Sequence, residues 1–147
     1  MKKSLLLSVL TLLVCISCSS DDDNFESKLT GKWECKSASY TTIDAKTGEE
    51  VSINYIPHIE QGSTLSFNND GSVLYEFIHR GDYRNDTTST KTTHYILSGN
   101  TIRLYLEFLY CSYMIDEITS SRLFLHRDTV YNNSIRTINK ALFEKID

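Results

Sequence analysis

The sequence contains little proline and glycine, and it lacks the motifs of several common enzyme classes. Its 147 residues include one proline, six glycines and one tryptophan. There is no Gly-x-Ser-x-Gly motif and no glycine-rich phosphate loop. Neither a His-x-His nor a His-x-x-x-His spacing occurs among the four histidines, which are His58, His79, His94 and His126. The sequence therefore predicts no catalytic residue, no metal site and no cofactor, and we expect that the protein is not an enzyme.

Basic residues are also in the minority. The chain has 15 lysines and arginines against 19 aspartates and glutamates. Loss of Lys2 and Lys3 with a cleaved leader would leave 13 basic residues and a net charge of −6. No basic stripe is present to displace counterions from phosphates. This charge balance argues against a nucleic-acid partner.

The longest apolar run lies at the N-terminus and is too short to cross a membrane. Residues 4–16 form a run of 13 residues that is rich in leucine and valine, whereas a bilayer core of about 30 Å needs about 20 residues. The run follows Lys2-Lys3 and ends in Ile16-Ser17-Cys18. This arrangement is typical of a bacterial lipoprotein signal peptide.

Cleavage before Cys18 would leave a cysteine that carries fatty acyl chains such as palmitate, and two or more chains anchor a protein stably. Cys15 is the alternative, although Val14 before it is larger than the usual small residue. We expect a signal peptide over 1–17, an acidic linker over 18–28 and a folded domain over 29–147. The membrane is thus an expected partner, through the lipid on Cys18.

An acidic run follows the expected anchor. Ser19-Ser20-Asp21-Asp22-Asp23 resembles the signal that some Gram-negative bacteria use to send lipoproteins to the outer face of the outer membrane. The same residues also suit a solvated linker. We therefore predict a lipid-anchored protein of the outer membrane. The sequence allows attachment at the cell-surface face or at the periplasmic face of that membrane.

Two cysteines remain in the expected mature domain, Cys35 and Cys111. An oxidising compartment allows them to form a disulfide. They also suit separate buried thiols that act as small apolar residues. The sequence leaves both alternatives open.

The mature chain has the composition of a β-sheet protein, with nine tyrosines and six phenylalanines. Trp33, Cys35 and Ser37 are expected on one face of the first strand. Asp70-Gly71 predicts a tight hairpin turn. The expected strands cover residues 33–42, 64–67, 73–79, 90–97, 102–110, 111–118, 122–127 and 141–146, with 102–118 alternatively forming one bent strand. Eight strands joined in order predict an all-β, antiparallel up-and-down barrel, which hides its edges by closing.

Short motifs resemble the lipocalin-like domains of small bacterial surface lipoproteins. Leu29-Thr30-Gly31-Lys32-Trp33 is similar to the Gly-x-Trp opening of lipocalins, and Leu65-Ser66-Phe67 before Asp70-Gly71 is similar to the hairpin that follows it. Ile118-Thr119-Ser120 and Leu123-Phe124-Leu125 match a late strand. The resemblance implies an eight-stranded barrel in which Trp33 plugs one end and a basic residue stacks on it. Lys140, Lys145 and Arg122 are the candidates for that residue.

The expected function is the binding of a small hydrophobic ligand inside the barrel. The candidate lining residues are Trp33, Phe67, Tyr75, Phe77, Leu104, Leu106, Phe108 and Tyr110. The alternative is a barrel filled by these side chains that acts as a cell-surface interaction module. In that case the loops 44–50, 51–62 and 80–89 would contact a protein or a glycan partner.

Overall fold

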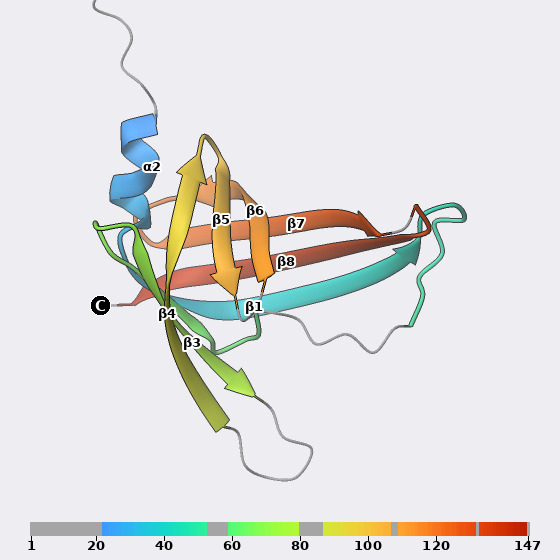
Figure 1. The fold of residues 1–147 in the computed structure, drawn as a ribbon, viewed down its shortest axis with the longest axis horizontal. Coiled ribbons are helices and arrows are strands. Elements are labelled where there is room, and N and C mark those ends of the chain that lie inside the picture. Colours follow the sequence, from blue (N-terminus) through green and yellow to red (C-terminus); the bar gives the residue numbers. More distant parts are fainter. Residues whose placement is uncertain (1–21, 53–58, 80–86, 107–108, 132, 147) are drawn as a thin grey trace, which may run out of the picture.

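The chain folds into one closed antiparallel barrel of eight strands, preceded by a helix (Figure 1). In this computed structural model the described residues are 22–52, 59–79, 87–106, 109–131 and 133–146. Each strand pairs with the next, and β1 pairs with β8 to close the barrel. The elements are α2 (Asp22–Leu29), β1 (Gly31–Asp44), β2 (Thr64–Phe67), β3 (Ser72–His79), β4 (Thr87–Ser98), β5 (Thr101–Leu106), β6 (Leu109–Ile118), β7 (Arg122–Tyr131) and β8 (Ile135–Ile146). The predicted fold class is confirmed.

The short turns explain why neighbouring strands pair. Asn68 donates its backbone N–H to the carbonyl of Ser72 at 2.9 Å, and Gly71 takes a φ of +78° between them. The Asp70 carboxylate accepts from the N–H of Ser72, which tightens the turn further. This geometry places Phe67 opposite Val73, so that both enter the core. The hairpin predicted from Asp70-Gly71 is therefore confirmed.

The prediction of a strand over 102–110 was wrong at its end. β5 ends at Leu106, and β6 begins at Leu109 and runs antiparallel to it, with Tyr105 opposite Tyr110. The alternative of one bent strand over 102–118 is excluded by this pairing. No glycine or proline marks the reversal in the sequence, so alternation alone extended the expected strand across it.

The strands β1, β7 and β8 are longer than expected and extend side by side beyond the shorter strands (Figure 1). β7 continues to Tyr131, and β8 begins at Ile135 rather than at Ala141. These extensions mix polar residues with Val130, Tyr131, Ile135 and Ile138, and the mixture shows no regular apolar alternation. The barrel therefore has an extended wall on one side.

A β-bulge changes which residues of β1 face inward. The register between β1 and β8 shifts between Cys35 and Ser37. Beyond the shift Thr42 lies opposite Thr137, and both are buried. Ser37 is exposed, so its predicted place on the face of Trp33 and Cys35 was wrong. A bulge adds one residue to one strand and reverses the alternation after it.

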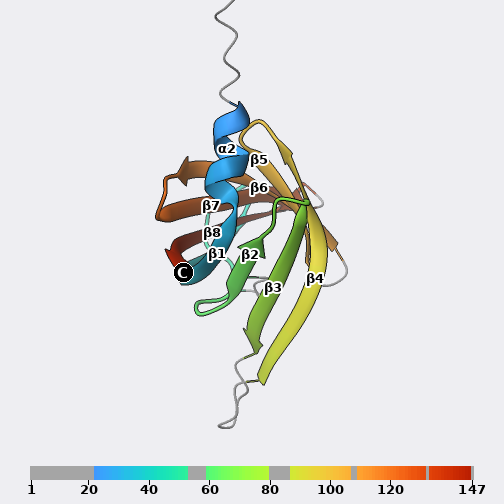
Figure 2. The ribbon, with the colours of Figure 1, turned by 90° about the vertical axis from the view of Figure 1, so that its left-hand side faces the viewer.

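Helix α2 covers one end of the barrel (Figure 2). Leu29, its last residue, is fully buried, and its carbonyl accepts a 2.7 Å hydrogen bond from the indole N–H of Trp33. A helix carbonyl near the C-terminus has no partner within the helix, and the indole supplies one. The helix occupies Asp22 to Lys28 of the segment expected as a linker.

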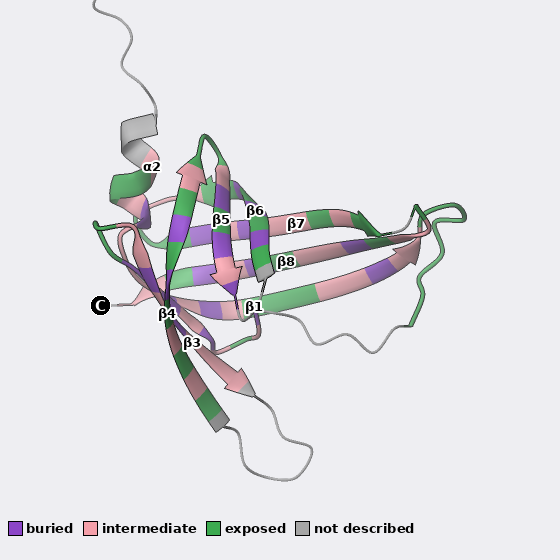
Figure 3. Ribbon diagram, viewed as in Figure 1, coloured by how far each residue is buried: buried purple, intermediate pink, exposed green. Residues whose placement is uncertain are grey.

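Burial is concentrated in the half of the barrel beside α2, which we call the closed half (Figure 3). Its core includes fully buried Trp33, Leu65, Leu104, Leu123 and Phe143. The far parts of β1, β7 and β8 are mainly half-buried or exposed. The barrel thus has a packed end and an end with little apolar packing.

Candidate functional site

The end of the barrel beside α2, which we call the floor, is built around Trp33. The Lys145 ammonium lies 5.0 Å from the centre of the indole ring and donates to the carbonyl of Lys28 at 3.2 Å. This settles which of the three basic candidates stacks on Trp33. Lys140 lies opposite His126 in the sheet, and Arg122 is exposed. The contacts of Lys145 join the end of β8 to both the helix and the indole.

A side chain at Gly31 would meet Lys145 at this end of the barrel. A Cβ atom on Gly31 would lie 2.5 Å from Cε of Lys145, closer than real contacts allow. The backbone φ of Gly31 is also +122°, a conformation that favours glycine. The absent side chain lets Lys145 pass over the Gly31 backbone to reach Trp33.

Most of the predicted lining residues face the interior of the barrel. Trp33, Phe67, Leu104 and Leu106 are at most 1% exposed, and Tyr75 is 2% exposed. Phe77 is partly buried and stacks on Tyr75 with a centroid distance of 4.9 Å. Phe108 lies outside the described residues. The structure brings these described side chains together on one inward surface.

Tyr110 does not belong to this lining, and its prediction was wrong. It is 66% exposed and packs against Tyr105, with 4.7 Å between the ring centres. Tyr105 lies between the inward-facing Leu104 and Leu106, so it points outward. The reversal after β5 moves Tyr110 to the next strand and turns it away from the interior.

Arg127 is an interior residue that the sequence reading missed. Leu123 and Leu125 of β7 lie opposite Phe143 and Ala141 of β8, and all four are buried. The next inward position on β7 is Arg127. Its Nη1 donates to Sγ of Cys111 at 3.1 Å, and Cys111 is fully buried. The alternation Leu123, Leu125, Arg127 was visible in the sequence, but the strand was expected to end there.

Arg127 belongs to a set of polar residues on the inward face of β1, β8 and β7, which we call the polar end. The register forms two rows across these strands. The first row is Tyr40, Asn139 and Arg127, and the second is Thr42, Thr137 and Thr129. Arg127 Nε donates to Thr129 Oγ1 at 3.1 Å, and Nη2 donates to the Tyr131 hydroxyl at 3.4 Å.

Among the described residues, two buried hydroxyl groups have no hydrogen-bond partner. Thr42 Oγ1 lies in the polar end, and Thr42 is 4% exposed. Ser63 Oγ is fully buried, and Ser63 accepts the backbone N–H of Cys35 at its carbonyl. Buried hydroxyl groups in proteins are nearly always hydrogen-bonded to protein, water or ligand. Each of these two hydroxyl groups is therefore available to hydrogen-bond with a polar group inside the barrel.

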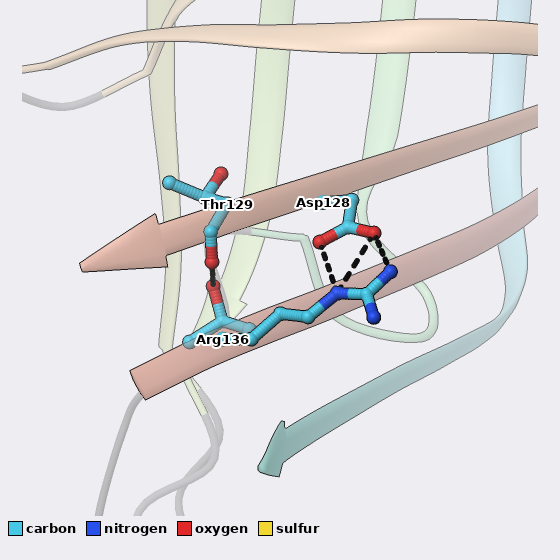
Figure 4. Close-up of polar contacts among 4 residues, drawn as sticks. Asp128, Thr129 and Arg136 are labelled. Atoms are coloured by element: carbon cyan, nitrogen blue, oxygen red, sulfur yellow. Dashed lines mark hydrogen bonds and ion pairs between the residues drawn. The ribbon is translucent and has the colours of Figure 1, made fainter. Parts of the chain in front are cut away.

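The outer face near the polar end is charged. Asp128 pairs with Arg136 on the next strand, with 2.9 Å between Oδ1 and Nε (Figure 4). The hydrogen bond from Arg136 holds the pKa of the Asp128 carboxyl below its ordinary value. The same two strands place the Thr137 hydroxyl 3.4 Å from the carbonyl of Thr129. Asp128 and Arg136 thus pair on the outer face, while their neighbours Thr129 and Thr137 belong to the inward row.

The described cysteines are separate thiols. Cys35 and Cys111 are not joined in a disulfide, and both are fully buried, which agrees with the alternative of two separate buried thiols. Burial raises the pKa of the Cys35 thiol to about 12, so the thiol stays protonated at neutral pH. Cys15 and Cys18 lie outside the described residues.

The described ranges contain no candidate metal centre and no candidate membrane-spanning helix. Histidine, cysteine, aspartate and glutamate form no group of three there that could hold a metal ion. His126 instead pairs with Asp116, with 2.7 Å between Nδ1 and Oδ1. No helix in these ranges has the length and the apolar character needed to cross a membrane.

Comparison with known proteins finds similarity in structure only. No protein-family model matches the chain, and no curated protein matches it. Two solved structures of bovine odorant-binding protein, one complexed with its natural ligand, match with a TM-score of 0.50 and 16% sequence identity. Each match covers 82% of this chain and 73% of that chain. At this identity the similarity establishes the fold, which is a lipocalin-like barrel of eight strands.

Proposed function

We propose that this protein is a lipid-anchored envelope lipoprotein whose barrel binds a small hydrophobic ligand in its interior. The observation that carries the proposal is the inward face of the barrel. Apolar side chains line its closed half, and the buried hydroxyl groups of Thr42 and Ser63 have no hydrogen-bond partner within the described part of the chain. A ligand site of this kind combines a mostly apolar wall with a few polar groups that fix orientation.

The similar fold of a known ligand-binding protein supports ligand binding but does not identify the ligand. Bovine odorant-binding protein, which shares the barrel, has been solved with its natural ligand. Eight strands enclose room for side chains or for one small ligand. The floor made by Trp33, Lys145 and Leu29 would close one end, and entry would then be from the other end.

The proposed anchor fits this geometry. Helix α2 begins four residues after Cys18 and lies at the closed half of the barrel. A lipid on Cys18 would therefore join the barrel at its floor, and the polar end would be directed away from the membrane. The acidic Asp21-Asp22-Asp23 would separate the floor from the lipid head groups. Transport of a ligand between the envelope and its surroundings would suit this orientation.

Ligand binding is tested with N-phenyl-1-naphthylamine, a neutral apolar fluorophore, added to the full-length protein in detergent. We expect saturable binding of one molecule per chain. Ala141→Leu adds volume to the inward face of β8 and should weaken binding, whereas Ser112→Leu adds the same kind of side chain to the exposed face of β6 and should not. Absence of a saturable signal above that of empty micelles would show a filled interior.

The anchor is tested by metabolic labelling with an alkyne analogue of palmitate, followed by mass spectrometry of the mature N-terminus. Cys18→Ser should abolish labelling, and Cys15→Ser should leave it unchanged. The reverse result would assign the lipid to Cys15. An unlabelled protein that retains Met1 would refute the anchor.

A second candidate function is contact with a protein or glycan at the cell surface. Ile96 and Met114 are 57% and 44% exposed on β4 and β6, and Tyr110 adds a 66% exposed ring on β6. Exposed aromatic and methionine side chains are enriched at interfaces. Cross-linking on intact cells would test this function, because Tyr110→Ser should remove any partner held by this face. An unchanged set of cross-links would exclude the face as the contact.

A further inference from the structure

We propose that the outer face of strands β4, β5 and β6 binds an acidic polysaccharide. A uronic-acid carboxylate of the polysaccharide would pair with Arg103, and its sugar rings would pack on Tyr105 and Tyr110. This inference rests on the second candidate function, contact at the cell surface, and adds the chemical class of the partner. It does not depend on a ligand in the interior of the barrel.

The first observation is a pair of tyrosine rings on the outer face. Tyr105 of β5 lies opposite Tyr110 of β6, and their ring centres are 4.7 Å apart with an angle of 52° between the ring planes. Tyr110 is 66% exposed, and Tyr105 is half-buried. A tyrosine combines an apolar ring with a polar hydroxyl. Such rings can cover the C–H groups of a sugar while their hydroxyls bond to its oxygen atoms.

The second observation is an arginine beside these rings. Arg103 is exposed on β5, two positions before Tyr105 and therefore on the same side of the strand. It makes no hydrogen bond or ion pair within the part of the chain that the structure describes. A guanidinium presents a planar fork of donors that matches a carboxylate in two parallel hydrogen bonds. The strand rise separates Arg103 from Tyr105 by about 7 Å, which is comparable with the length of one sugar unit.

The third observation is the distribution of charge around Arg103. Ile96 of β4 and Ser112 of β6 flank it in the sheet, and both are exposed and uncharged. Within the described residues of β4, β5 and β6 the only carboxylates are those of Asp116 and Glu117. They lie at least about 13 Å beyond Ser112 along β6, and Asp116 pairs with a histidine of β7. Salt screens charges over that distance, so the guanidinium of Arg103 is available to an anion.

The charge of the whole chain favours this face as the place where an acidic polymer binds. The chain has a net charge of −4, and the summed field of an acidic protein repels an anionic chain. Binding of an acidic polysaccharide therefore needs a cation that lies next to groups able to contact sugar rings. Arg103 beside the two tyrosines meets this need.

The size of the face favours a glycan over a protein. Strands β4, β5 and β6 are neighbours in the barrel (Figure 1), and three neighbouring strands span about 10 Å. A stable protein interface covers about 800 Å² of each partner, which is far more than an area of about 10 by 7 Å provides. A few sugar units match this area.

The test measures binding of three uronic-acid hexasaccharides, prepared from polygalacturonate, polymannuronate and hyaluronan, to the full-length protein. Isothermal titration calorimetry is carried out in a neutral detergent that has no sugar groups. The matched ligand is the methyl ester of each hexasaccharide, which keeps the sugar rings but has no charge. Inorganic polyphosphate supplies anionic charge without sugar rings.

We expect at least one acid to bind about fivefold or more tightly than its ester and than polyphosphate at low salt, and the preference over the ester should fall as salt is raised. Arg103→Gln should remove the preference for the acid over the ester. Tyr110→Ser should weaken acid and ester alike, because ring contacts do not depend on charge. Arg122→Gln, which removes an exposed arginine at the start of β7, should bind like the unchanged protein.

Each other outcome overturns a defined part. Equal binding of acid and ester, unchanged in Arg103→Gln, would refute the role of the carboxylate. Polyphosphate that binds as tightly as the acids would refute the recognition of sugar rings. No binding by any of the three acids would refute the inference as a whole. Cross-links that are lost in Tyr110→Ser would then assign a protein partner to this face, and the interior site would still be tested by N-phenyl-1-naphthylamine.

Discussion

The closed half and the polar end share the strands β1, β7 and β8, and on these strands the inward-facing residues change from apolar to polar within two positions. In the closed half, Leu125 of β7 lies opposite Ala141 of β8, and both are buried. Two residues further along, Arg127 lies opposite Asn139. The first pair contributes apolar packing, whereas the second places polar side chains in the interior. Apolar and polar inward-facing residues are thus divided along the barrel axis.

The largest expected effect is the loss of Trp33 from the closed half. Trp33→Ala should lower the free energy of unfolding by about 3–5 kcal/mol, because it removes a fully buried side chain and leaves a cavity. Val130→Ala, at a 53% exposed position near the polar end, should change it by less than about 0.5 kcal/mol. Urea denaturation followed by circular dichroism measures both. Similar decreases in the free energy of unfolding for the two variants would contradict the assignment of the stabilising apolar packing to the closed half.

A second effect concerns the reactivity of the buried thiol in the closed half. Because burial raises the pKa of Cys35 to about 12, little thiolate exists at pH 8, and the thiolate is the form that is alkylated. Iodoacetamide should leave Cys35 unmodified in the folded protein and modify it after unfolding in urea without reductant. Peptide mass spectrometry checks this. A Cys35 that stays blocked after unfolding would indicate a disulfide instead.

A third effect tests the floor. Gly31→Ala should lower the free energy of unfolding by about 1–3 kcal/mol, because its φ of +122° strains an L-residue and its Cβ would displace Lys145. Gly71→Ala is the matched control, since its φ of +78° carries the strain without a neighbour within 4 Å. The loss should be greater for Gly31→Ala. An equal loss in urea titrations would show that the contact with Lys145 adds nothing.

A fourth effect sharpens the account of the polar end. Thr42→Val replaces the unpartnered hydroxyl with a methyl group of similar size, so the ligand-free protein should gain about 1 kcal/mol. Thr137→Val should give no such gain, because the Thr137 hydroxyl donates to Thr129. Thermal denaturation compares the two. A loss of stability in Thr42→Val would mean that its hydroxyl has a partner within the protein.

The smallest effect concerns an ion pair on the outer face of the closed half. Hydrogen bonds from Thr64 and then Lys32 hold the pKa of Glu76 below its ordinary value of 4.5. A lowered carboxyl pKa stabilises the folded state above the ordinary value, and this contribution is lost as the pH falls through the folded-state pKa. Glu76→Gln should lack this acid-dependent loss, which amounts to less than about 1 kcal/mol at a partly exposed site. Urea midpoints at pH 7 and at about pH 3 measure it, and an unchanged difference between them would contradict the assignment.

Alternation and turn residues predicted the strands of the closed half and the hairpin at Asp70-Gly71. They failed where the structure departs from a period of two or from apolar residues. The bulge between Cys35 and Ser37 leaves no mark in the sequence, yet it directs Thr42 inward. Arg127 was missed because a charged residue is ordinarily read as the end of a strand. A site that needs polar groups inside a barrel is therefore hidden from rules based on apolar patterns.

The most direct test of the central claim is a crystal structure of the protein with N-phenyl-1-naphthylamine. We predict density for one ligand molecule in the interior of the barrel, in contact with the apolar inward-facing side chains. An interior filled by side chains alone, with the Thr42 hydroxyl bonded within the protein, would contradict the account.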